Sequence, residues 1–175
     1  SLGRYEHKEF LHFRYYPGFY DTLSAFVSQM VPIKYEVHIH HISNLFFSLL
    51  TIFGISKITG RFFNKKAGKI VFLICFLNPI FFGHMSINPK DTITAFSNVW
   101  ATYFIIRYLQ TQHISSKRKY FATLLGLTIG FGVGIRAIFL GTLIPIFILT
   151  ILDIFFLKKF TSKKFLLTNF FIDVL

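Results

Sequence analysis

Four polar side chains that could do chemistry lie close together between two apolar stretches of the chain: His84, Asn88, Lys90 and Asp91. A carboxylate such as Asp91 can orient a reacting group, and basic neighbours can bind an anion. The alternative for Asp91 is helix capping, because a turn at Asn88-Pro89 would place this carboxylate in the first turn of a helix, near free N–H groups. Capping alone does not require the other three side chains. Since ionisable groups beside apolar segments are costly and usually functional, we expect a functional site here.

Arg136 is the second residue that could do chemistry, because it lies within an apolar run that extends from Phe121 to Leu152. A guanidinium there costs a few kcal/mol unless it pairs, binds an anion or reaches water. Its planar fork suits a phosphate, held by two oxygens. The alternative is a snorkelling or salt-bridged arginine at a helix end. The nearest acid along the chain is Asp153, so the partner should come from elsewhere in the fold, either Asp91 or a bound ligand.

Two histidines, His40 and His41, open the first apolar stretch. They could be metal ligands, bases or anchors at the membrane interface. Two histidines without a placed carboxylate make a weak metal signal, and the single cysteine, Cys75, offers no thiolate site. The sequence therefore supports no cofactor and no divalent metal, and interface anchoring is the favoured role for the pair.

The elements that position these residues are predicted to be membrane helices. The chain of 175 residues is too apolar for an ordinary soluble domain, since 53% of it is hydrophobic and 25 residues are Phe. Stretches close to the roughly 20 residues that cross a bilayer occur at 39–57, 69–87, 92–109, 119–135 and 137–157. A turn between the last two of these stretches is indicated by Gly130, Gly132 and Gly134, followed by Arg136. The sequence predicts an all-α, polytopic transmembrane helical bundle of about five spans plus the start of a sixth.

Lysine and arginine predict how the bundle is threaded. They gather after the first, third and fifth spans, within residues 57–69, 107–119 and 158–164, and no Asp or Glu interrupts these connections. The three basic connections can all face the cytoplasm only if the 119–157 region crosses the membrane twice. The charges therefore support dividing this region into two spans, independently of the glycines. A net charge of +12 could also indicate nucleic-acid binding. The basic residues form short clusters rather than a stripe with interleaved aromatics, so we expect no nucleic-acid partner.

The chain divides into an extracytoplasmic interfacial arm, residues 1–38, and a transmembrane helical region, residues 39–175. Apolar residues at helical spacing from Phe19 to Met30 predict a helix in the arm, lying in the headgroup plane or serving as an ordinary loop helix. Because the chain starts at Ser1 and ends within an apolar segment, we expect a piece of a longer protein. With several spans, it should be an integral, multi-pass membrane protein.

Several short motifs follow one another along the chain in a distinctive order. They are Phe13 to Asp21 (FRYYPGFYD), His40-His41 opening a span, Asn78-Pro79, Gly83-His84, Asn88-Pro89-Lys90-Asp91 and Gly134-Ile135-Arg136. This order resembles the membrane part of protein O-mannosyltransferase-like glycosyltransferases of the GT-C superfamily. The resemblance covers roughly residues 10–140, and the block from Pro79 to Asp91 is its most specific piece.

The resemblance implies an enzyme that takes a sugar from a polyprenyl-phosphate carrier and transfers it to an acceptor, whose identity stays open, at the extracytoplasmic face. Such a transfer inverts the anomeric carbon, with a carboxylate base and basic groups that hold the lipid phosphate. Asp91 would then be catalytic, in an orienting or structural role, while the substrate would be bound by His41, His84, Asn88, Lys90 and Arg136.

The family also has a catalytic acidic residue in its first extracytoplasmic loop, after a first transmembrane helix that this chain is expected to lack. Glu6 and Glu9 are the weak candidates for that acid in the downstream part of the loop. If the acid is missing, the fragment alone should be inactive.

The rival hypothesis is a multi-pass transporter or a non-catalytic membrane scaffold. In a transporter, Arg136, Asp91 and the Gly-rich turn would line a substrate path. A transporter should place ionisable groups near mid-membrane and show paired, repeated halves. Here the polar groups gather at one face and no repeat is evident, which favours the enzyme.

Overall fold

The computed structural model describes residues 18–29, 32, 35–79, 81, 83 and 89–152. Within this part the chain forms helices and no strand, which confirms the all-α prediction. The helices are α1 (Phe19–Gln29), α2 (Glu36–Phe62), α3 (Lys65–Leu77), α5 (Pro89–Gln110), α6 (Ser115–Ile135), α7 (Phe139–Thr142) and α8 (Ile144–Leu152).

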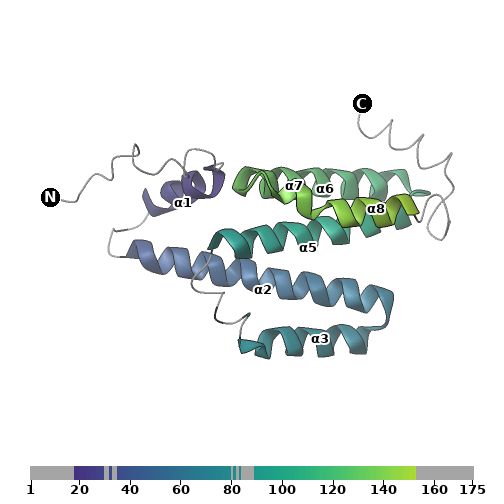
Figure 1. The fold of residues 1–175 in the computed structure, drawn as a ribbon, viewed down its shortest axis with the longest axis horizontal. Coiled ribbons are helices and arrows are strands. Elements are labelled where there is room, and N and C mark those ends of the chain that lie inside the picture. The colour runs from purple at the N-terminus through teal and green to yellow at the C-terminus, as the bar shows by residue number, and fades with distance from the viewer. Residues whose placement is uncertain are drawn as a thin grey trace.

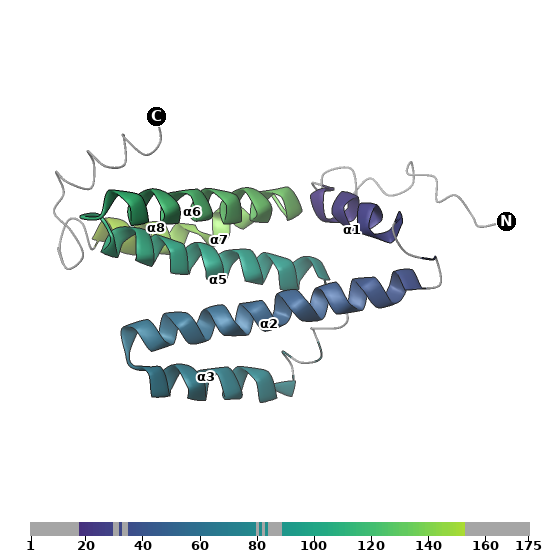
Figure 2. The same ribbon diagram turned by 180° about the vertical axis from the view of Figure 1, so that it is seen from behind.

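The long helices lie side by side, with α2 and α5 running in one direction and α3 and α6 in the other (Figures 1 and 2). Helix α5 packs between α2 and α6, while α3 packs on the side of α2 that faces away from α5. The short helix α1 contacts α6 and α2. We call the end where α2 and α5 begin and α6 finishes the α1 end. The opposite end, with the α2–α3 and α5–α6 connections, is the basic end.

Small residues let the helices approach closely. A Cβ added at Gly68 of α3 would lie 2.7 Å from the carbonyl oxygen of Ser56 on α2. In the same contact the Ser56 hydroxyl donates a hydrogen bond of 2.8 Å to the Gly68 carbonyl. Small residues and interhelical hydroxyl bonds are typical of helix packing in membranes, where the hydrophobic effect does not drive helices together. The α2–α3 hairpin is therefore held by backbone proximity.

Polar residues occupy the interface between α2 and α5, while many large apolar side chains lie on the outside. Asn44, Ser48 and Thr51 of α2 are at most 1% exposed, and Ser97 of α5 is fully buried. On α8, Phe147, Ile148, Leu149 and Ile151 are all exposed. This distribution is the opposite of a soluble domain and fits a bundle whose outer surface meets lipid.

The described part of the 119–157 region divides after Ile135, where the sequence predicted a break, and α7 and α8 follow; the glycines do not form the turn. Helix α6 continues through Gly130, Gly132 and Gly134 to Ile135, and the chain becomes extended only at Arg136 (φ −147°, ψ 123°). Gly132 and Gly134 instead make room for the aromatic rings of Phe139 and Phe19. A Cβ at Gly132 would lie 2.6 Å from the ring of Phe139, which is fully buried.

The span expected at 69–87 is not one continuous helix in the structure. Helix α3 ends at Leu77 after 13 residues, and its C-cap Asn78 is extended (φ −70°, ψ 117°). The physical reason is Pro79, because a proline disfavours the helical conformation of the residue that precedes it. By contrast, α5 begins at Pro89, a position where proline is preorganised for a helix start.

By length and composition, one helix of the described part qualifies as a membrane span, Val37–Phe62, and the apolar segment Phe139–Leu152 is shorter. Helices α5 and α6, with 22 and 21 residues, are long enough but are not among the helices that are also sufficiently apolar. The helix positions match the predicted ranges, apart from α3. The number of membrane crossings stays a prediction.

Candidate functional site

Asp91 and Arg136, two of the residues that the sequence singled out for chemistry, form an ion pair. An Nη1 atom of Arg136 lies 2.5 Å from Oδ1 of Asp91, although the residues are far apart in the chain. The side chains are 30% exposed for Arg136 and 53% exposed for Asp91. Of the two partners that the sequence offered for Arg136, Asp91 or a bound ligand, the structure identifies Asp91 as one. Both groups remain accessible to a ligand from outside the bundle.

Antiparallel packing of α5 and α6 explains why these residues meet. Asp91 is in the first turn of α5, where a carboxylate interacts favourably with the positive end of the helix dipole. Arg136 is the C-cap of α6, and its backbone N–H donates a hydrogen bond of 3.1 Å to the Gly132 carbonyl. A cation is favoured at this negative helix end. The two helix ends therefore carry matched charges at the α1 end of the bundle.

An apolar cluster lies directly beside the ion pair. Tyr20 of α1, Ile93 of α5 and Ile135 of α6 are at most 5% exposed and contact one another, with Phe47 and Phe131 packed against them. Ile93 and Ile135 neighbour Asp91 and Arg136 in the sequence. The cluster anchors helix α1 to the start of α5 and the end of α6.

The remaining predicted site residues are distributed unevenly. Lys90 is partly buried beside Asp91, while His41 is exposed on the first turns of α2. His84, Asn88, Glu6 and Glu9 lie outside the described residues. Among the residues that the structure describes, no group of three or more His, Cys, Asp or Glu side chains comes together to hold a metal ion.

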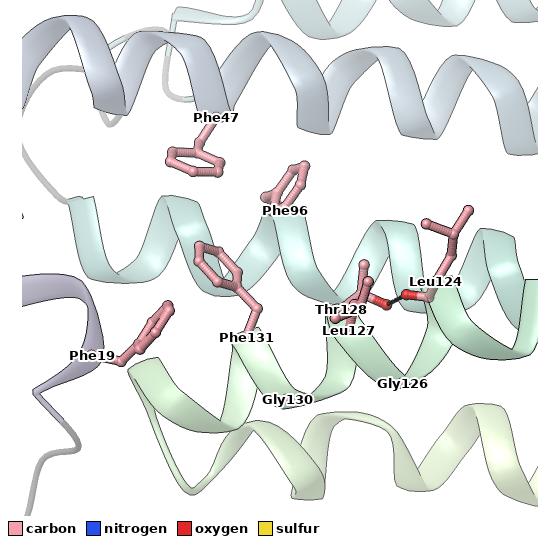
Figure 3. Close-up of a pocket in the computed structure, with 9 residues that line it drawn as sticks. All are labelled: Phe19, Phe47, Phe96, Leu124, Gly126, Leu127, Thr128, Gly130 and Phe131. Carbon is pink, nitrogen blue, oxygen red and sulfur yellow. Dashed lines mark hydrogen bonds between the residues drawn. The ribbon is translucent and has the colours of Figure 1, made fainter. Parts of the chain in front are cut away.

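An apolar cavity of about 550 Å³ lies along α6 (Figure 3), and Phe131, which lines it, precedes Arg136 in the sequence by five residues. Four aromatic rings line it, each from a different helix: Phe19 of α1, Phe47 of α2, Phe96 of α5 and Phe131 of α6. A Cβ added at Gly126 or Gly130, which also line the cavity, would meet nothing within 4 Å. The cavity is therefore open at these two glycines. Neither Asp91 nor Lys90 is among the residues that line this cavity.

Sequence reasoning missed the aromatic cavity and the buried polar face of α2. The ring of Tyr20 lies 6.3 Å from that of His40, measured between centroids, and Asn44 follows one turn later, 1% exposed. The four-residue spacing of His40, Asn44 and Ser48 was the available signal, because residues at that spacing share one face of a helix. The cavity had no comparable signal, since phenylalanine is abundant along the whole chain.

Comparison with known proteins agrees with the membrane-enzyme hypothesis. No curated protein and no solved structure matches the chain. A family model does match, over residues 36–173, which is most of the chain and includes both members of the ion pair. The resemblance that the motifs indicated is thereby confirmed at the level of the family, a family of membrane glycosyltransferases of the GT-C type. The chain belongs to the dolichyl-phosphate-mannose-protein mannosyltransferase family.

Proposed function

We propose that the chain is part of a membrane glycosyltransferase that transfers a sugar from a polyprenyl-phosphate carrier to an acceptor at the extracytoplasmic face. Family membership supports the reaction class. The proposal of a polyprenyl-phosphate carrier rests on the Asp91–Arg136 ion pair, which is accessible from outside and close to an apolar cavity. A lipid phosphate needs both parts, a cation for its head and an apolar surface for its chain.

Arg136 is the group that holds the carrier phosphate in this proposal. A guanidinium has five N–H donors, so an ion pair to one carboxylate oxygen is compatible with a second contact to phosphate. The sugar leaves its carrier with the bonding electrons on a phosphate oxygen, and a nearby cation stabilises that charge. Arginine suits this role because it stays charged and can contact two oxygens at once.

Asp91 acts as a positioning residue in the same proposal. Its carboxylate holds the guanidinium at the end of α6, in the orientation that faces the arm helix. The base that deprotonates the acceptor is a separate group. Glu6 and Glu9 remain its candidates, with His84, Asn88, Lys90 and His41 as further substrate-binding candidates.

The carrier chain occupies the aromatic cavity. Phe131 and Ile135 are one turn apart on α6, so the cavity wall leads along the helix toward Arg136. Phe19 lies across from Phe131 at a centroid distance of 5.5 Å and closes the cavity on the α1 side. An isoprenoid chain, which is branched and apolar, is complementary to such rings and to the open space at Gly126 and Gly130.

A binding measurement tests the proposal. Affinity for a polyprenyl-phosphate analogue is compared in nanodiscs for the wild type, Arg136→Lys, Arg136→Gln and a control, Arg61→Gln, which removes an arginine at the basic end. A hydrogen bond to a charged group contributes about 1.5–3 kcal/mol, so Arg136→Gln should weaken binding by roughly ten- to hundredfold. Arg136→Lys should also weaken it, while Arg61→Gln should have no effect. Equal affinity in all four proteins would leave Arg136 as a structural ion-pair partner only.

The transporter alternative gains no specific support from the structure. In the described part of the bundle the interior polar residues between α2 and α5 are uncharged, namely Asn44, Ser48, Thr51 and Ser97. A path for an ionic substrate would be expected to place charged groups at this depth. The ionisable side chains of the described helices lie instead toward their two ends.

A further inference from the structure

The basic end of the bundle carries a concentration of positive charge. On the α2–α3 side are Lys57, Arg61, Lys65, Lys66 and Lys69, and on the α5–α6 side are Arg107, Lys117, Arg118 and Lys119. The acidic residues within the described ranges, Asp21, Glu36 and Asp91, all belong to helix starts at the α1 end. Nothing in the described part of the basic end therefore offsets its charge. Such clusters beside a membrane helix are typical sites of attraction for anionic lipids.

A second cavity opens at this end, between α2, α5 and α6. Its volume is about 490 Å³, and Lys57 lines it together with Phe53, Trp100, Tyr103, Tyr120 and Leu124. The ammonium group of Lys57 lies 5.0 Å from the centroid of the Phe53 ring, a cation–π distance. Tyr120 is 61% exposed, as expected for an aromatic residue at a membrane–water boundary. The cavity thus combines an apolar floor with a cation and a phenol near its mouth.

The second cavity is distinct from the proposed carrier site, although both lie along α6. Leu124 of α6 lines both cavities, which are otherwise lined by residues toward opposite ends of the helices. From Tyr120 to Phe131 the helix rises by about 16 Å, at about 1.5 Å per residue. The two cavities therefore follow one another along α6. The one at the basic end does not include Arg136 or any residue of α1.

We propose that the second cavity is a binding site for an anionic phospholipid. Its phosphate lies at Lys57, close to the Tyr120 hydroxyl, and an acyl chain runs over Trp100 toward Leu124. The lipid carries a net negative headgroup, because the ammonium of a zwitterionic headgroup would meet the same positive field and be repelled. The proposal goes beyond the proposed transferase function, since it concerns a different ligand at the opposite end of α5 and α6.

The single tryptophan of the chain provides the test, because Trp100 lines this cavity and not the first one. Phospholipids with brominated acyl chains quench a tryptophan that they contact. Brominated phosphatidylglycerol and brominated phosphatidylcholine are each titrated into the detergent-purified full-length protein that contains this chain. Other tryptophans of that protein, if present, are replaced by phenylalanine. The anionic lipid should quench Trp100 at a concentration about fivefold lower than the zwitterionic lipid, the factor expected from one nearby lysine.

Two matched variants separate a site from diffuse surface charge. Lys57→Gln should abolish the preference for phosphatidylglycerol. Lys69→Gln makes the same charge change on an exposed residue of α3 that does not line the cavity, and it should keep the preference. Both lysines are exposed, so both variants should fold. Equal quenching by the two lipids in the wild type, or an equal loss of preference in the two variants, would overturn the proposal.

Discussion

Replacing Gly132 by alanine should disturb the turn that carries Arg136. A Cβ at this position would lie 2.6 to 2.7 Å from three ring atoms of Phe139, far inside van der Waals contact. Phe139 is fully buried and packs with Ala101 and Leu143, so its ring cannot simply rotate away. The strain must be relieved by a shift of α7 relative to α6, and Arg136 lies between these two helices.

The magnitude follows from two opposing terms. Alanine is favoured over glycine within a helix by about 1 kcal/mol. Forcing a methyl group into a packed core costs about 1–3 kcal/mol, and the short contacts at Gly132 favour the upper part of that range. We expect a net destabilisation of roughly 1–2 kcal/mol for Gly132→Ala.

Gly130 is the matched control, because it lies two residues earlier on the same helix and an added Cβ would meet nothing within 4 Å. The overpacking cost is absent there, so Gly130→Ala should be neutral or stabilising by up to about 1 kcal/mol. Unfolding of both variants and the wild type is measured in detergent micelles by titration with a denaturing detergent, followed by tryptophan fluorescence.

The effect on the site is measured separately, as affinity for the polyprenyl-phosphate analogue under native conditions. Gly132→Ala should weaken this affinity, because the guanidinium is displaced from the end of α6. The reasoning is refuted if the two alanine variants unfold at the same denaturant concentration. That result would mean that Phe139 does not pack against Gly132 as described, and it would remove the geometric basis for the position of Arg136.

Further predictions concern threading and the ion pair. In a Cys75→Ser background, a membrane-impermeant thiol reagent added outside should label Asn88→Cys and not Lys66→Cys, and the reverse pattern would invert the predicted topology. For the ion pair, a double-mutant cycle of Asp91→Asn and Arg136→Gln should give a coupling free energy of unfolding of about 0.2–1 kcal/mol, because both side chains are substantially exposed. In the full-length enzyme, Asp91→Asn should lower turnover by more than it lowers protein level. An equal loss of both would indicate that the carboxylate serves only to cap α5 and pair with Arg136.

Much of the helix layout could be predicted because its signals are local. Apolar stretches predicted where α2, α5 and α6 lie, and Asn88-Pro89 indicated the start of α5. The same locality produced the errors. The glycines of α6 resembled a turn signal, but their neighbours in space are Phe139 and Phe19, and a sequence does not reveal which rings will pack against a glycine.

The candidate site shows the same division. The sequence by itself determined that Arg136 needs an anionic partner, because an isolated guanidinium among apolar residues is costly, and it reduced the choices to Asp91 or a ligand. Only the tertiary structure identified Asp91 as a partner of Arg136, because the antiparallel packing of α5 and α6 brings together residues that are 45 positions apart. The two aromatic cavities were likewise decided by packing alone. A cavity is the space left between helices, so its existence depends on their separation and rotation, which no residue spacing within one helix determines.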